Sequence, residues 1–332
     1  MAGPLEASLA VLNGVLGDYL ARTDNGLATE MELFLSSSGA GPLALERGAV
    51  ERALRGIAAT SPGAEHATSA WSSGSPVRVV VLVHGLMWTE TVWRMGDGSD
   101  YGTRLAADLG FVPLYVRYNT GLPLAENGAL LDRLLTRLLA AAPGAIDEMV
   151  AIGHSMGGLA IRSACHAARS DAAAASRWLP RLRRAFYLGT PHLGAPLERI
   201  GRLATRILRT VPDPYARMVA EIADLRSDGI KDLGDGLGGR GAPLRDAHHP
   251  VPLLPEIEHY LVAASLSGDP LLATLFGDAL VPVTSATNGA VHPIDAPVPP
   301  SHMKLFPSSG HMGLAHDEGV YRCIRAWCGG LP

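Results

Sequence analysis

The residue best placed for chemistry is Ser155, in the sequence Gly153-His154-Ser155-Met156-Gly157. A short apolar run, Met149-Val150-Ala151-Ile152, precedes it, and an apolar run of helical length follows it. This order predicts a strand, a very tight turn and a helix, with the flanking glycines leaving room for the turn. The serine would stand at the carboxyl end of the strand, where helix N–H groups favour developing negative charge. The pattern therefore indicates nucleophilic chemistry.

Strands and helices alternate around this turn. Predicted strands cover residues 79–83, 111–118, 149–152, 185–188, 259–264 and 303–306, and the first of these is apolar on both faces, as expected for a central parallel strand. Predicted helices cover residues 101–109, 126–141 and 317–327. The alternation predicts an α/β protein with a mostly parallel, doubly wound sheet.

Together these motifs resemble the α/β-hydrolase superfamily, and more closely bacterial lipase-like proteins related to the GPI-inositol-deacylase and triacylglycerol-lipase families. The matching stretches are Val83-His84-Gly85-Leu86, Arg117-Tyr118-Asn119-Thr120-Gly121, Gly153 to Gly158, Gly189-Thr190-Pro191-His192-Leu193-Gly194-Ala195-Pro196 and Gly277-Asp278-Ala279-Leu280-Val281-Pro282. They cover roughly residues 77–330. The resemblance implies the α/β-hydrolase fold with a helical lid insertion, to which this chain adds an N-terminal helical arm.

The resemblance also implies an oxyanion hole made of main-chain N–H groups. Its donors would be Leu86, in the loop after the 79–83 strand, and Met156, which follows the nucleophile. Because the role belongs to the main chain, neither position needs a special side chain. His84 lies too early in the chain for the base of this fold, so we expect it to shape the loop by hydrogen bonding.

A serine hydroxyl needs a base, and the base needs an acid that fixes its tautomer. In this fold the chain order is serine, acid, histidine. Asp278 is the favoured acid because its surroundings resemble the Gly-Asp-Gly-x-Val-Pro run of lipases, with Ala279 in place of the second glycine. Asp269, nearer to the preceding strand, is the alternative.

The favoured base is His311, in the loop between the last strand and the closing helix. His316 and His302 are the alternatives; the first precedes the acidic start of the helix, and the second begins the strand. His192 and Leu193 follow the 185–188 strand, so we expect them to line the substrate pocket rather than to act as catalysts.

We expect two parts in the chain, an N-terminal helical arm at residues 1–75 and an α/β-hydrolase domain at residues 76–332. Within the domain, the alternation lapses at residues 190–258, where lipases commonly carry a cap or lid; an ordinary surface insertion is the alternative. The sequence there contains Asp246, His248 and His249, but adjacent histidines point in different directions, so we expect no metal site.

The composition of the chain argues against several classes of protein. The 332 residues include 28 Lys and Arg against 32 Asp and Glu, a net charge of −4 that argues against nucleic-acid binding. Three cysteines, Cys165, Cys323 and Cys328, form no disulfide framework. The N-terminus lacks a basic signal region, and no apolar run approaches the ~20 residues of a membrane span. We expect a cytoplasmic protein without stable membrane insertion, although the sequence leaves secretion open.

The resulting expectation is a serine carboxylesterase or lipase that hydrolyses small-molecule esters of short to medium acyl chains and needs no cofactor. Thioester hydrolysis or acyl transfer on the same triad and long-chain triacylglycerol hydrolysis are the alternatives. A non-catalytic binding protein of the same fold is the least favoured, because it would have no reason to keep nucleophile, acid and base together. The sequence leaves the oligomeric state open.

Overall fold

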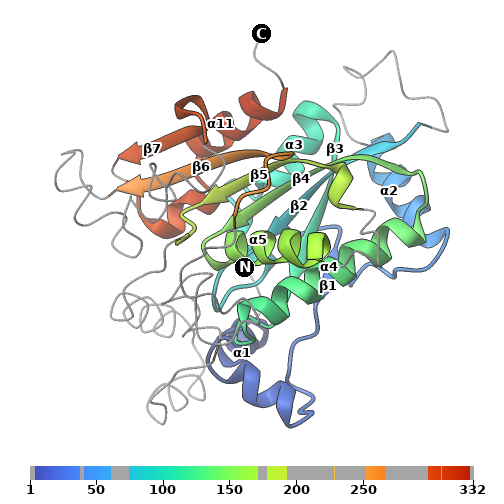
Figure 1. Cartoon of the computed structure of the whole chain (residues 1–332), viewed down its shortest axis with the longest axis vertical. Coiled ribbons are helices and arrows are strands. Elements are labelled where there is room, and N and C mark those ends of the chain that lie inside the picture. The colour runs from blue at the N-terminus through green and yellow to red at the C-terminus, as the bar shows by residue number, and fades with distance from the viewer. Residues whose placement is uncertain are drawn as a thin grey trace.

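The computed structural model describes residues 4–37, 41–60, 75–170, 178–192, 228, 252–265, 298–307 and 309–329. Within these residues, one sheet of seven strands has the order β1-β3-β2-β4-β5-β6-β7 (Figure 1). The strands are β1 Glu32–Phe34, β2 Val77–Val83, β3 Phe111–Arg117, β4 Ile146–His154, β5 Leu182–Leu188, β6 Glu258–Ser265 and β7 Met303–Pro307. Every strand pair is parallel except β1 with β3. The predicted mostly parallel sheet is confirmed.

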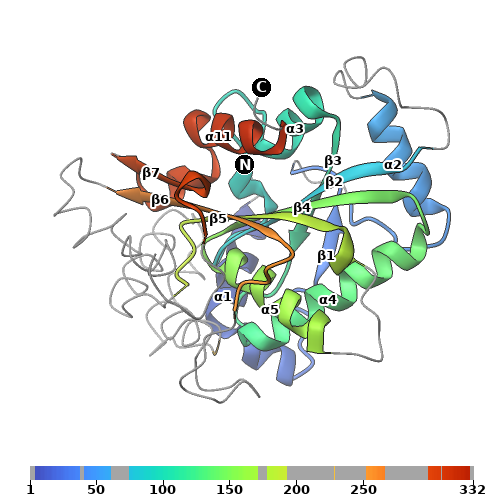
Figure 2. The same ribbon diagram turned by 45° about the horizontal axis from the view of Figure 1, so that its top comes forward.

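Helices cover both faces of the sheet, as Figure 2 shows. The α-helices are α1 Pro4–Arg22, α2 Ala49–Thr60, α3 Tyr101–Leu109, α4 Leu124–Ala141, α5 Met156–Ser170 and α11 Glu318–Gly329. Short 3-10 helices are η2 Glu90–Trp93, η3 Leu179–Arg181, η5 Pro300–His302 and η6 His311–Ala315. The apolar β2 strand divides its side chains between the two layers: Val79 and Val81 pack with α2, α4 and α5, and Val80 packs with α3 and α11. Because alternate side chains point into the two layers, β2 is apolar from Val79 to Val83.

The N-terminal region contains a strand that the sequence did not predict. Residues 4–22 and 49–60 are helical and fall within the predicted helical arm, but β1 lies between them and pairs antiparallel with β3, for example Leu33 with Val116. A strand of three residues is too short to show a period in the sequence. The first part of the chain therefore extends the sheet as well as packing on it.

Parallel pairing brings the carboxyl ends of β2, β4, β5 and β7 to one edge of the sheet. The residues that follow these strands include most of the predicted site. Asp269, Asp278, Leu193 and nearly all of the predicted cap at residues 190–258, including Asp246, His248 and His249, lie outside the described residues.

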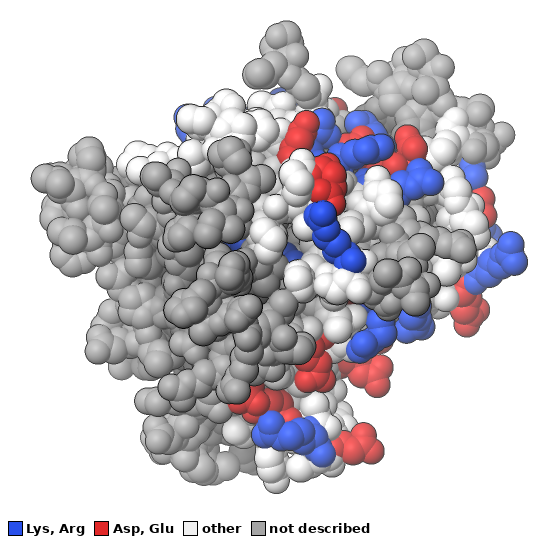
Figure 3. Space-filling view, viewed as in Figure 1, with Lys and Arg blue, Asp and Glu red and all other residues white. Residues whose placement is uncertain are grey.

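The described surface is mixed in charge (Figure 3), in line with the near balance of acidic and basic residues in the sequence. Acidic and basic side chains intermingle on the described part of the face in Figure 3. Among the described helices, none is long and apolar enough to cross a membrane. All three cysteines are free, and burial raises the pKa of Cys165 and of Cys328 to about 12. Both thiols therefore stay protonated at neutral pH, which makes them poor nucleophiles.

Candidate active site

Ser155 lies in a tight turn between β4 and α5. Its backbone has a φ of +53°, a left-handed conformation that non-glycine residues rarely adopt and that is held only where the surroundings impose it. The main-chain N–H of Ser155 donates to the carbonyl of Leu188 at the end of β5 (2.8 Å). A Cβ atom at Gly153 would lie 2.5 Å from Gly158 Cα, and one at Gly157 would lie 2.2 Å from the Val83 carbonyl oxygen. The turn therefore requires glycine at both flanking positions, as the sequence predicted.

The Ser155 hydroxyl is buried at the amino end of α5. The residue is 2% exposed, and its Oγ makes no hydrogen bond to a described residue. The N–H of Met156, the first residue of α5, likewise donates to no described residue. A hydroxyl held beside an unengaged amide at a helix N-terminus suits attack on a carbonyl, because negative charge would develop next to positive partial charges.

The loop after β2 lies directly against Ser155. A Cβ atom at Gly85 would be 3.0 Å from Ser155 Cβ. Met87 has a φ of +61°, and its N–H donates to the Thr120 hydroxyl (3.1 Å). The Leu86 N–H, by contrast, donates to no described residue. Of these two neighbouring amides, Leu86 is therefore the one available to a ligand, and it is the one predicted from the sequence.

His84 is buried in the base of this loop. Its Nδ1 donates to the Gly85 carbonyl (2.9 Å), its ring stacks on Tyr118 at 4.6 Å, and the Tyr118 hydroxyl donates to the His84 carbonyl (2.9 Å). Burial lowers the pKa of His84 to about 4, so the imidazole is neutral at pH 7. These contacts agree with the expectation that His84 shapes the loop.

His311 is buried at the start of η6, next to the end of β5. A Cβ atom at Gly189 would lie 3.1 Å from both Cε1 and Nδ1 of His311. Gly189 directly follows Leu188, which accepts the Ser155 N–H, so the His311 ring and Ser155 adjoin the same strand end. The structure thus brings the predicted nucleophile and the predicted base to neighbouring positions.

His154, which sequence reasoning did not single out, connects the two. Its Nε2 donates to the His311 carbonyl (3.0 Å), and the two rings lie 5.0 Å apart. His154 occupies the variable position before the serine in the Gly153–Gly157 turn. The signal in the sequence was a polar residue soon after the apolar run Met149-Val150-Ala151-Ile152.

The alternative histidines lie elsewhere. His316 is exposed and follows the end of η6. His302 stacks on Tyr260 (4.1 Å) just before β7 begins. The assignment of His311 as base stays a prediction, but of the three histidines it lies nearest to the nucleophile turn.

His192 is buried shortly after the end of β5. Its Nδ1 accepts a hydrogen bond from Arg162 of α5 (2.7 Å), and its ring meets Tyr187 edge-on at 4.9 Å. Burial, aided by the Arg162 charge, holds the pKa of His192 well below its ordinary value, so the ring is neutral. The described contacts of its ring are with α5 and β5, and a role in the pocket wall stays a prediction.

Comparisons with known proteins place this geometry in a family. Residues 80–322 match the Alpha/beta hydrolase family. Among solved structures, the chain is similar to Bacillus licheniformis lipase BlEst2 in mature form, at 18% identity and a TM-score of 0.45 over 77% of this chain and 94% of that one. It is also similar to the gene lin2722 products from Listeria innocua, at 14% identity and a TM-score of 0.46 over 77% of this chain and 95% of that one.

A third similar structure is a thermophilic esterase from Thermogutta terrifontis, at 17% identity and a TM-score of 0.41 over 77% of this chain and 90% of that one. These likenesses are too distant to assign a substrate. No curated protein matches the chain. The family match extends over well more than half of the chain, from β2 to α11, and the chain therefore belongs to the alpha/beta hydrolase family.

Proposed function

We propose that the protein is a serine hydrolase that cleaves carboxylic esters, with Ser155 as nucleophile, His311 as base and Asp278 as acid. The observation that carries the proposal is the Ser155 turn: a strained φ of +53° holds a buried hydroxyl at the amino end of α5. Such strain persists only where the surrounding structure imposes it, and it gathers at functional sites. A turn that only connected β4 to α5 would not need it.

The proposed reaction follows from the positions of the groups. His311 takes the proton of the Ser155 hydroxyl as the oxygen attacks the ester carbonyl carbon. The carbonyl oxygen becomes an oxyanion, which accepts hydrogen bonds from the N–H groups of Leu86 and Met156. Asp278 stabilises the imidazolium. His311 then protonates the departing alkoxide, which leaves an acyl group on Ser155.

The second half of the reaction reverses these roles with water as nucleophile. His311 removes a proton from water, which attacks the acyl carbon, and Ser155 leaves with that proton restored. The burial of Ser155, Leu86 and Met156 supports this proposal, because hydrogen bonds to an oxyanion are stronger where water is excluded. Ser155 and His311 need not be hydrogen bonded without substrate, since catalytic hydrogen bonds often tighten only in the substrate complex.

For the substrate, we propose esters of short to medium acyl chains. The support comes from the sequence of the predicted cap, which is rich in apolar residues, and each acyl methylene buried against such residues contributes about 0.8 kcal/mol. The apolar residues in question are Leu193, Leu197, Ile200, Leu203, Ile207 and Leu208, all outside the described residues.

The test is a rate profile of the wild type and Ser155→Ala on p-nitrophenyl esters of graded chain length, above and below each ester's solubility limit. We expect hydrolysis that depends on Ser155 and is fastest on short to medium chains in solution. Equal rates for the two proteins would overturn the serine mechanism. A sharp rise in rate when a long-chain ester forms an emulsion would instead favour a lipase. A rate that does not depend on chain length would show that the predicted cap does not bind the acyl chain.

A further inference from the structure

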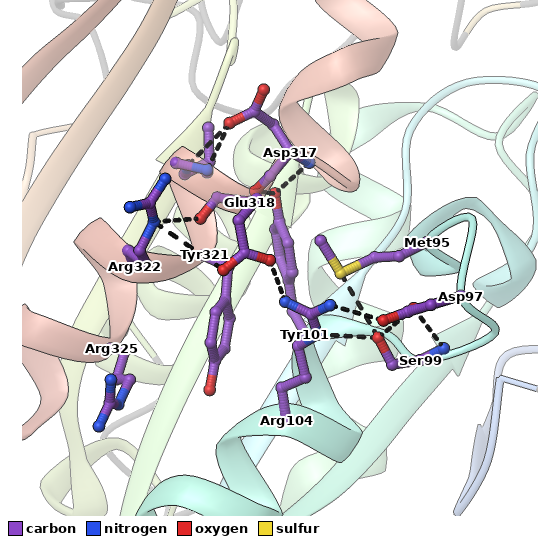
Figure 4. Close-up of polar contacts among 12 residues, drawn as sticks. Met95, Asp97, Ser99, Tyr101, Arg104, Asp317, Glu318, Tyr321, Arg322 and Arg325 are labelled. Atoms are coloured by element: carbon purple, nitrogen blue, oxygen red, sulfur yellow. Dashed lines mark hydrogen bonds and ion pairs between the residues drawn. The ribbon is translucent and has the colours of Figure 1, made fainter.

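A buried tyrosine hydroxyl contacts the end of the η6 turn, which carries His311. Tyr101 is the first residue of α3 and is fully buried. Its Oη accepts the N–H of Asp317 (2.9 Å), and its hydrogen lies within reach of the carbonyls of Leu314 and Asp317 (2.9 Å each). Figure 4 shows the Tyr101 side chain reaching Asp317 from α3. Tyr101 thus satisfies main-chain groups on either side of the end of η6.

The tyrosine is itself firmly placed. Asp100 caps α3 by accepting a hydrogen bond from the Thr103 N–H (2.8 Å). It also accepts a hydrogen bond from the Tyr115 hydroxyl of β3. The Tyr101 ring packs between Trp93 and Tyr321, at centroid distances of 5.9 and 6.0 Å. A rigid helix start and two aromatic neighbours leave the hydroxyl little freedom to move.

Two of the hydrogen bonds among the described residues therefore hold the turn at opposite ends. At its start, His154 donates to the His311 carbonyl (3.0 Å), and near its end Tyr101 binds the Leu314 carbonyl. His154 adjoins the nucleophile and holds the start of the turn. The Tyr101 hydroxyl holds the end of η6, so the two contacts together fix the orientation of the turn.

The other polar contacts between α3 and α11 do not reach η6. Arg104 pairs with Glu318 and with Asp97 (2.8 Å), and the Tyr321 hydroxyl donates to Asp108 (2.7 Å). Figure 4 shows Arg104 between Glu318 and Asp97. These contacts attach α11 to α3, and none of them involves a residue of η6.

We propose that Tyr101 is a positioning residue for catalysis, whose hydroxyl fixes the η6 turn so that the His311 ring stays aligned with Ser155. The inference rests on the proposed role of His311 as base. Burial raises the pKa of Tyr101 above its ordinary value, so the hydroxyl keeps its proton and remains a donor.

The experiment compares Tyr101→Phe with Tyr321→Phe. Each variant removes one hydroxyl from the α3–α11 interface and keeps the ring, but only the first loses a contact to η6. We expect Tyr101→Phe to lower kcat by about 10- to 100-fold with KM changed less than about twofold, because a displaced base impairs chemistry rather than binding. Tyr321→Phe should keep kcat within about twofold.

Hydrogen exchange provides a reading that does not depend on activity. In the wild type, the amides of Gly313, His316 and Asp317 all donate within or beside the turn, so they should be protected like those of α11. In Tyr101→Phe the peptide covering residues 311–317 should exchange at least about tenfold faster, and in Tyr321→Phe it should not.

Equal kcat values for Tyr101→Phe and Tyr321→Phe would overturn the proposal, and so would free exchange of residues 311–317 in the wild type. If the wild type shows no hydrolysis that depends on Ser155, the proposed function fails, and hydrogen exchange alone then decides whether Tyr101 holds the turn. The wild-type exchange reading remains decisive if Tyr101→Phe does not fold.

Discussion

The two segments that flank Ser155 are held in place in different ways. The loop after β2 is held by hydrogen bonds between its main chain and the side chains of Tyr118 and Thr120, which lie just after the next strand along the chain, β3. These residues are only 34 and 33 positions from their partners in the loop. The η6 turn is held by His154 and Tyr101, at separations of 157 and 213 residues. The oxyanion side of the site is thus supported locally, and the base side by the assembled sheet.

This difference has a consequence for folding and catalysis. The β2–β4 part of the sheet contains the nucleophile, its turn and the supports of the oxyanion loop. The base joins them only when β7 and α11 have docked. Loosening the C-terminal part should therefore remove the base while leaving Ser155 and its amides in place, and variants on the two sides should fail in different ways.

The largest effect is expected on the base side. His311→Ala should lower kcat by about 10⁴-fold or more, since the serine then has no base. His316→Ala is the matched control, because that side chain is exposed beyond the same turn, and it should stay within about twofold of wild type. Steady-state ester hydrolysis checks both. A dead His316→Ala beside an active His311→Ala would move the base out of η6.

The acid is expected to matter nearly as much. Asp278→Asn should lower kcat by about 10⁴-fold, because a neutral amide neither stabilises the imidazolium nor fixes its tautomer. Asp269→Asn should cost far less. Kinetics of the two variants on one ester decide between them; if Asp269→Asn is the inactive one, the acid is the carboxylate nearer to β6.

A smaller loss is expected on the oxyanion side. Thr120→Val keeps the shape of the side chain but removes the acceptor of the Met87 N–H, which lets the Leu86 amide drift. We expect kcat to fall by about 10- to 100-fold with little change in KM. Thr120→Ser should restore activity because it returns the hydroxyl. Loss of activity in both variants would point to packing rather than to the hydrogen bond.

The smallest effect concerns the pH dependence of stability. The unfolded chain protonates His84 near pH 6.5 but the folded chain only near pH 4, so the stability from its neutral form is present above pH 6.5 and lost as the pH falls toward 4. Across that window the wild type should lose about 1 kcal/mol per pH unit relative to His84→Gln, because one titrating group contributes at most ~1.4 kcal/mol per unit. Urea unfolding at a series of pH values measures this, and parallel curves for the two proteins would rule out the neutral buried imidazole.

The same contrast explains what the sequence could predict. The turn at Ser155 and the strand before Leu86 leave local marks, namely glycines at fixed spacing and an apolar strand, so their positions could be predicted. The parallel order of the strands followed from alternation. His311 was chosen by chain order and by its place in the loop after the last strand, whereas His316 precedes the acidic start of the closing helix.

The supports of the turn could not be predicted at all. From the sequence, Tyr101 is an ordinary apolar residue of a predicted helix, and His154 is the variable residue between Gly153 and Ser155. Their roles exist only because the sheet brings residues more than 150 positions apart into contact. The strand β1 escaped for a different reason, since three residues are too few to show alternation.

The most direct test of the central claim is covalent labelling by a fluorophosphonate, with the modified peptide mapped by mass spectrometry. We predict stoichiometric modification of Ser155 in the wild type, none in Ser155→Ala, and slow modification in His311→Ala, whose serine lacks its base. Full labelling of Ser155→Ala, or a label on another residue of the wild type, would contradict the assignment of Ser155 as the nucleophile.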